Sequence, residues 1–283
     1  MKSHIKFTLG LVSILFSSCM TMTTSYFQVY KVVPSDKIIN KDNTLLFIDE
    51  NCVVSYNLWS EKGNIGFQFY NKTGKNIYID LQESFFILNG TSYNYFKNRV
   101  FTSSKSAGIT SSRGSTMSQS VTGNNNLSLL QTNRISSTNS VGILTSSEFS
   151  VSYNEEKIIC IPSKTSKIIT EYKINETPYR DCDLFKYPTK KQIKIKTFTK
   201  EQSPFTFSNR ISYRVDKSDE LIKFENEFYI SEIGNYPESE FLEKKYDNYC
   251  GQESFNVLNY FKNASADKFY IKYEKGQYDD LRH

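Results

Sequence analysis

Cys19 is the residue whose surroundings indicate chemistry most clearly. Lys2 and Lys6 precede an apolar stretch from Phe7 to Phe16, and two serines separate that stretch from the cysteine. The stretch is too short to cross a bilayer, which is typical of a secretory signal peptide. Small residues directly before a cysteine resemble a bacterial lipobox, whose cysteine becomes the lipidated N-terminus. We therefore predict a lipoprotein signal peptide over residues 1–18 and an acylated Cys19.

Acylation would make the membrane the first partner of the protein. Two or more acyl chains anchor a protein stably, whereas a single chain is marginal. Removing residues 1–18 takes away two of the 35 basic residues and none of the 30 acidic ones, which leaves the chain close to neutral. A near-neutral chain offers no footprint for nucleic acid, so we expect no nucleic-acid partner. The alternative is a soluble secreted protein in which Cys19 is incidental.

The four other cysteines could form a disulfide framework. An even number of cysteines in an exported chain is typical of disulfides, and four cysteines admit three connectivities. We favour Cys52 with Cys160, because both lie in apolar runs that could face each other, and Cys182 with Cys250, because both lie in turn-like segments. Buried free thiols are the alternative.

Histidine is too scarce for most catalytic designs. His4 lies in the predicted signal peptide, and His283 is the last residue. A Ser-His-Asp or Cys-His mechanism therefore has no general base, and zinc loses its commonest ligand. We expect no catalytic residue, no metal and no cofactor. Two mechanisms need no histidine. A Ser-Lys dyad is disfavoured, because Ser163-Lys164 lies in a turn without an S-x-x-K pattern. The enzymatic alternative that we keep is a carboxylate-based glycoside hydrolase, for which the densest acids are Glu225, Glu227, Glu232, Glu238 and Glu240.

Aromatic side chains offer a simpler chemistry, which is binding. The lone tryptophan, Trp59, has Tyr56, Tyr93 and Tyr95 near it on or beside predicted strands. Aromatic rings with a polar tip suit sugar rings and protein interfaces. We take these four residues as a possible ligand-binding set; the alternative is that they fill the core.

The side chains considered above must be positioned by strands, which the composition and the alternation of apolar residues predict. The 20 Tyr and 21 Phe residues favour strands over helices. Apolar residues alternate over 65–70 and 77–81 on either side of a polar turn, which predicts a hairpin. Asn89-Gly90 predicts a tight turn after Ser84–Leu88. We predict a mostly β protein, with an antiparallel, immunoglobulin-like β-sandwich over 44–177.

The remaining segments divide the chain further. Residues 19–43 lack sustained periodicity and predict a tether, with a first strand over Phe27–Val33 as an option, and 102–140 predict a long loop rich in Ser, Thr and Asn. Residues 178–275 predict a second β-rich half, either a separate domain or packed on the first. Within it we expect extra strands and one or two short helices, one after Pro237 and one over Ser254–Phe261.

Several runs resemble an uncharacterised family of small outer-membrane lipoproteins from Bacteroidota, among them SYNLW (55–59), FYNKTGKNIYIDLQESFFILNG (69–90) and NEFYISEIGNYPESE (226–240). The resemblance implies location in the outer membrane and brings no assigned activity. Residues 20–23 lack the acids that follow the cysteine in surface-exposed lipoproteins of such bacteria, so we expect a periplasm-facing protein. The favoured function is non-enzymatic binding of an envelope protein or another envelope component, or a structural role; the first alternative is glycan binding.

Overall fold

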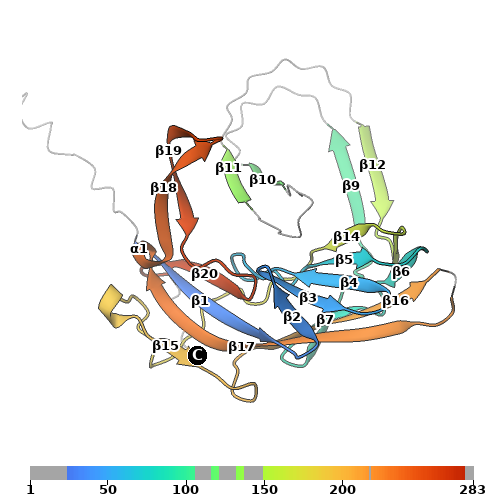
Figure 1. Cartoon of the computed structure of the whole chain (residues 1–283), viewed down its shortest axis with the longest axis horizontal. Coiled ribbons are helices and arrows are strands. Elements are labelled where there is room, and N and C mark those ends of the chain that lie inside the picture. The colour runs from blue at the N-terminus through green and yellow to red at the C-terminus, as the bar shows by residue number, and fades with distance from the viewer. Residues whose placement is uncertain (1–23, 106–115, 121–131, 137–148, 217, 278–283) are drawn as a thin grey trace, which may run out of the picture.

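The computed structural model describes residues 24–105, 116–120, 132–136, 149–216 and 218–277. The predicted signal peptide and Cys19 lie outside this part of the chain. The described chain is mostly β, as predicted, and its sheets are antiparallel. Two of the sheets form a curled sandwich, from which strand pairs project (Figure 1).

The larger sheet has nine strands drawn from the whole length of the chain. Its main path runs in the order β13 (Ile158–Ile161), β6 (Ile77–Asp80), β16 (Thr206–Val215), β17 (Ile222–Pro237), β1 (Ser25–Pro34) and β20 (Lys268–Glu274). Three short strands lie off this path: β15 (Ile195–Thr197) pairs with β17, and β7 (Phe85–Leu88) pairs with β16 and with β8 (Thr91–Asn94). Strands from both sides of the predicted boundary at 178 are therefore hydrogen-bonded in one sheet.

The smaller sheet has five strands. They run in the order β14 (Ser166–Ile169), β5 (Phe67–Asn71), β4 (Cys52–Tyr56), β3 (Thr44–Ile48) and β2 (Ile38–Lys41). In β5, Phe67 and Phe69 are buried while Gln68 and Tyr70 between them are partly exposed. This alternation directs one face of the sheet into the core and the other toward solvent.

Tyrosines are among the largest fully buried side chains of the core, and each of their hydroxyls has a polar partner. The Tyr56 hydroxyl accepts a hydrogen bond from the Asn226 amide at 2.7 Å, and the Tyr213 hydroxyl donates to Asp49 at 2.7 Å. Burial raises the pKa of both phenols, which stay protonated. A buried hydroxyl without a partner would cost about 1–3 kcal/mol, so the hydrogen bonds make these rings tolerable inside the sandwich.

The tether prediction is wrong for most of the described residues, whereas the first strand allowed within it is present. Residues 19–43 include β1, which lies between β17 and β20, and β2. Phe27 and Gln28 are both buried, because Phe27 packs against Phe241 on one side while Gln28 binds Asn235 and Tyr179 on the other. Burial on both faces removes regular alternation, which is why this strand shows no sustained periodicity in the sequence.

The hairpin predicted from 65–70 and 77–81 is also wrong. Both strands exist, as β5 and β6, but they lie in different sheets. The turn between them carries the chain from one layer to the other. The buried Asn71 amide holds this crossing, because it donates to the carbonyl oxygens of Lys75 at 2.7 Å and Ile161 at 3.0 Å.

The helices of the second half are shorter than predicted. The helix after Pro237 is a single turn, α1 (Glu238–Phe241), and a 3-10 turn, η1, covers Lys190–Gln192. The segment Ser254–Phe261 is not a helix but part of a strand, β19 (Gln252–Phe261), paired with β18 (Leu242–Tyr249). No helix in the described part of the chain is long and apolar enough to span a bilayer.

The segment predicted as a long loop contains strands. β9 (Val100–Lys105) enters it and pairs with β12 (Phe149–Asn154), and β10 (Thr116–Ser120) pairs with β11 (Thr132–Ser136). The residues between these strands lie outside the described part of the chain.

The predicted disulfides are not present, because Cys52, Cys160, Cys182 and Cys250 are free thiols. Cys52 is buried on β4, whereas Cys160 is exposed on β13 of the other sheet, where Ile161 beside it points inward. Strand alternation thus turns Cys160 away from Cys52. Cys182 lines a hollow with Gln28 and other residues beside β1, while Cys250 occupies the turn at the tip of the β18–β19 hairpin.

Candidate functional site

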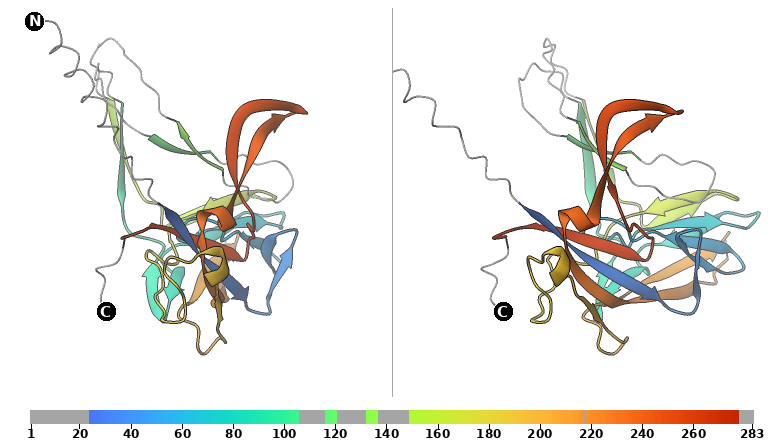
Figure 2. Two further views of the ribbon diagram at one scale, coloured as in Figure 1. Left: turned by 90° about the vertical axis from the view of Figure 1, so that its left-hand side faces the viewer. Right: turned by 60° about the vertical axis from the view of Figure 1, so that its left-hand side comes forward.

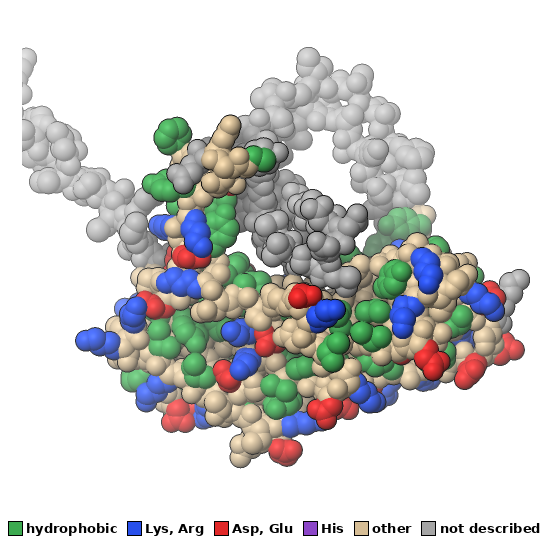
Figure 3. Space-filling model, in the orientation of Figure 1, with side chains coloured by type: hydrophobic (Ala, Val, Ile, Leu, Met, Phe, Trp, Pro, Cys, Tyr) green, Lys and Arg blue, Asp and Glu red, His purple; other side chains and the backbone are tan. Residues whose placement is uncertain are grey.

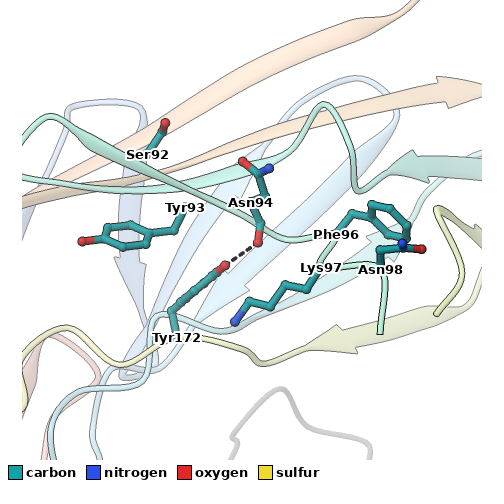
Figure 4. A pocket seen from close by; sticks show the side chains of 7 residues that line it. All are labelled: Ser92, Tyr93, Asn94, Phe96, Lys97, Asn98 and Tyr172. Carbon is teal, nitrogen blue, oxygen red and sulfur yellow. Dashed lines mark hydrogen bonds between the residues drawn. The ribbon is translucent and has the colours of Figure 1, made fainter. Parts of the chain in front are cut away.

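The best candidate site is an open hollow beside β8, which we call the tyrosine hollow. Its volume is about 630 Å³, and it is lined by Ser92, Tyr93, Asn94, Phe96, Lys97, Asn98 and Tyr172. Most of these residues come from one stretch, at and after the end of β8, and Tyr172 comes from the segment after β14 (Figure 4). The site therefore lies where chain leaving the larger sheet meets chain leaving the smaller one.

The turn at Asn89-Gly90 sets the position of β8. Both residues have positive φ, 47° and 81°, as a two-residue hairpin turn requires. The turn pairs Phe86 with Tyr93, which is 42% exposed. Asn89 and Gly90 are thus the local signal that places Tyr93 on the surface.

Tyr172 closes the other side of the hollow. Its ring centroid lies 5.1 Å from that of the buried Phe86 and 6.0 Å from that of Tyr93. Its hydroxyl donates a hydrogen bond to the carbonyl oxygen of Asn94 (Figure 4). Burial raises the pKa of the Tyr172 phenol, which is therefore neutral near pH 7. Contact with Phe86 and the hydrogen bond to Asn94 fix the Tyr172 ring, which preorganises it for contact with a ligand.

The charges beside the hollow neutralise one another. The Lys97 ammonium lies 4.6 Å from the centroid of the Tyr172 ring and 2.7 Å from a carboxylate oxygen of Glu171. Arg99 binds Glu171 at 2.8 Å and also binds Glu155. The hydrogen bond with Glu171 raises the pKa of Lys97. Desolvation opposes ionisation of Glu155, but hydrogen bonds from Arg99 and from two backbone N–H groups outweigh it and lower the pKa of this carboxyl.

This arrangement suits binding rather than catalysis. Both carboxylates are held by cations, and the lowered pKa of Glu155 makes this group unsuited to act as a general acid near pH 7. In the described ranges, no group of three or more His, Cys, Asp and Glu side chains could hold a metal ion. The hollow offers three aromatic rings, two of them tyrosines, with side-chain amides and a serine hydroxyl around them. Such a lining can contact the face of a ligand ring and hydrogen-bond its edges.

The structure separates the four aromatic residues predicted from the sequence. Tyr56 is fully buried and Tyr95 is 3% exposed, so both belong to the core. Trp59 is half-buried in a second cluster with Phe241 and Tyr270. Only Tyr93 lines the tyrosine hollow. Its main partner, Tyr172, is 79 positions away in sequence, and no local signal marks it.

The acids considered for glycoside cleavage lie along β17 and α1, and most are engaged in ion pairs. Four of the five pair with basic side chains: Glu225 with Arg210 at 2.8 Å, Glu227 with Lys200 at 2.8 Å, Glu232 with Lys31 at 2.8 Å and Glu240 with Lys190 at 3.1 Å. Desolvation opposes ionisation of Glu225, but Ser208 and Arg210 outweigh it and lower the pKa of its carboxyl. A general acid needs a raised pKa, so this carboxyl is unsuited to that role.

Comparison of the chain with protein-family models, curated proteins and solved structures finds no match. Fold and site together define the class to which the molecule belongs. It is an antiparallel β-sandwich protein with an open, charge-balanced aromatic hollow on its surface.

Proposed function

We propose that the protein is a lipid-anchored envelope lipoprotein with a non-enzymatic binding role, held at the outer membrane through acylated Cys19 and facing the periplasm. The tyrosine hollow is the observation that carries the binding role. Two rings at its surface are held in place by Phe86 and by a backbone carbonyl before any ligand arrives. Such rigid aromatic anchors dominate binding energies in protein interfaces. The partner is another envelope component, either a protein or a glycan.

A neutral glycan is the ligand that the lining favours. Tyr93 can stack on the apolar face of a sugar ring beside Tyr172, whose ring already contacts Phe86 and Lys97. Ser92, Asn94 and Asn98 can hydrogen-bond the sugar hydroxyls. Lys97 is already paired with Glu171, so an acidic sugar would gain little from this cation. The specific observation in favour of a glycan is therefore an aromatic surface surrounded by polar groups without a free charge.

The binding role is tested with the full lipoprotein in detergent. Pull-downs from solubilised envelope and arrays of neutral and acidic glycans are compared for the wild type and the Tyr93→Ala/Tyr172→Ala variant. The matched control is Tyr153→Ala, because Tyr153 on β12 is 58% exposed and lies outside the hollow. We expect the partner to be lost only in the double variant. Equal binding by all three proteins would exclude the hollow as the site.

The anchor is tested separately. Mass spectrometry of the mature protein should find Cys19 as the N-terminus, carrying acyl chains, and the Cys19→Ala variant should lose them. Protease treatment of intact cells should leave the protein intact, since we propose a periplasm-facing orientation. An unmodified Cys19 would exclude lipid anchoring, and digestion on intact cells would exclude the orientation.

A further inference from the structure

The β18–β19 hairpin, which we call the projecting arm, leaves the sandwich and carries apolar side chains into solvent. Its two strands form a sheet of their own that pairs with no other described strand. Figure 2 shows the arm rising from the body beside α1, and Figure 3 shows hydrophobic side chains along it. An isolated two-stranded hairpin is marginally stable in water, so an arm of this length calls for a surface to contact.

One face of the arm is mainly apolar. The register pairs Leu242 with Phe261, Lys244 with Asn259 and Tyr246 with Val257, and it shifts directly beyond this last pair, where Phe255 lies. Phe255 is fully exposed, Tyr246 is 62% exposed and Val257 is 51% exposed.

The base of the arm is fixed to the body by aromatic rings. The Phe261 centroid lies 5.3 Å from that of Phe241, 5.1 Å from that of Tyr270 and 5.2 Å from that of Trp59. Phe27 of β1 stacks on Phe241 at 4.2 Å. The apolar face therefore continues from a packed cluster at the base to exposed side chains further out, and its direction is set by the body.

The predicted anchor enters the fold at this same place. Tyr26 pairs with Pro237, the residue directly before α1, so β1 begins where the arm leaves the sheet. Six residue steps separate Cys19 from Ser25, which span at most about 20 Å when fully extended. The bilayer that holds the lipid thus lies within about 20 Å of the base of the arm, and the arm itself is about 26 Å or more in length.

We propose that the projecting arm is a second membrane contact, with its apolar face lying in the interfacial region of the bilayer that holds Cys19. This inference rests on the proposed lipid anchoring. Phe and Tyr side chains on an amphipathic element suit the boundary between headgroups and acyl chains. Lys244 lies on the same face, where its ammonium group can meet phosphates. Asp247 follows Tyr246, so the arm lies along the surface and its tip does not cross into the acyl chains.

The contact gives the anchored protein an orientation. A lipid on a short tether limits the distance between the sandwich and the bilayer but leaves the sandwich free to rotate. A second contact next to the tether would hold the sandwich at one angle to the bilayer, in the way that two membrane signals act together.

Depth-dependent quenching by brominated lipids tests the contact. The lone tryptophan is first removed with Trp59→Phe, and single reporters are then introduced as Phe255→Trp on the arm and Ile48→Trp as the control. Ile48 is 51% exposed on β3 of the body. Each full-length lipoprotein is reconstituted into phosphatidylethanolamine and phosphatidylglycerol vesicles with and without brominated acyl chains. We expect roughly twofold quenching for the Phe255→Trp variant, and little for Ile48→Trp, because interfacial elements lie about 5–10 Å into the boundary.

The outcomes separate the two proposals. Without quenching of the Phe255→Trp variant on vesicles that retain the acylated protein, the arm contact is overturned and the anchor stands. An unacylated Cys19 would overturn both. Trypsin digestion of the unsubstituted lipoprotein gives a second measurement: cleavage after Lys244 should be slower on vesicles than in detergent, while cleavage after the exposed Lys37 should not change. Equal rates after Lys244 would also overturn the contact, in favour of a second copy or another protein on the arm.

Discussion

The sandwich and the projecting arm place the same kinds of side chain in opposite surroundings. Phe69 on β5 is fully buried between the two sheets, whereas Phe255 on β19 is fully exposed. In the sandwich even the polar ends of tyrosines find partners, as Tyr95 does in Asn209 at 2.7 Å. In the arm apolar rings face solvent on a sheet of two strands. The body therefore buries its own apolar side chains, while the arm exposes apolar side chains that the body does not cover.

The largest expected effect is on the body. Phe69→Ala should lower the free energy of unfolding by about 4 kcal/mol, because it removes a fully buried ring and leaves a cavity in a packed core. Urea unfolding of the purified protein in dilute detergent, followed by circular dichroism, measures the change. A loss below about 1 kcal/mol would mean that the core around β5 is loosely packed, and would weaken the contrast with the arm.

Asn209→Leu should have the next largest effect, about 3 kcal/mol, although the two side chains are similar in volume. The substitution leaves the Tyr95 hydroxyl and the Ile65 carbonyl oxygen, which accepts from Asn209 at 2.9 Å, without these partners. The Asn209→Leu/Tyr95→Phe variant removes the unpaired hydroxyl as well and should recover about 1 kcal/mol. If the double variant is no more stable than the single one, desolvation of the hydroxyl is not the cause of the loss.

The sequence predicts these body positions well where the signal is local. Asn89-Gly90 predicts its turn because the residues themselves favour positive φ, and the turn is present. The segment 71–76 has equally clear turn chemistry, yet it connects two sheets. Local turn signals are the same for a hairpin and for a crossing between layers, and only the long-range pairing of β5 with β4 and of β6 with β16 decides between them.

The arm and the tyrosine hollow are harder to predict for a related reason. Phe255, Leu258 and Phe261 fit a helical period, while Phe255, Val257 and Phe261 fit a strand on one face, so the pattern supports both structures. Pairing with β18 decides for the strand. Tyr172 likewise reaches the hollow only through the meeting of two segments distant in sequence, and burial of Tyr56 and Tyr95 depends on which face of each strand meets the core.

Arg99→Ala should have a smaller effect, about 1 kcal/mol, because the guanidinium is partly exposed and solvent screens its ion pairs. Arg99 holds the base of another projecting hairpin, β9–β12, by charge, whereas rings hold the base of the arm. The folded-state pKa of Glu155 is lowered, so its contribution is present above the ordinary carboxyl range and is lost as the pH falls through the lowered value. The difference between wild type and variant should therefore shrink between pH 7 and pH 3.

The control for this ion network is Lys223→Ala, which removes an exposed pair with Glu83 at 2.9 Å. Urea unfolding at both pH values should show almost no change for this variant. A wild-type advantage over Arg99→Ala that persists at pH 3 would mean that packing of the arginine stem, rather than its charge, holds the β9–β12 base.

Phe255→Ala should have the smallest effect on stability, within about 0.5 kcal/mol in detergent solution, because the ring makes almost no contact to lose. Both Phe255→Ala and Phe69→Ala remove the same ring, so the difference between their effects on stability reports the surroundings of the ring alone. On vesicles Phe255→Ala should affect the orientation of the protein more than Phe69→Ala does, since only Phe255 would face the bilayer. If Phe255→Ala instead destabilises the protein in detergent as Phe69→Ala does, the ring is buried against the body in solution, and the arm is part of the core rather than a free contact surface.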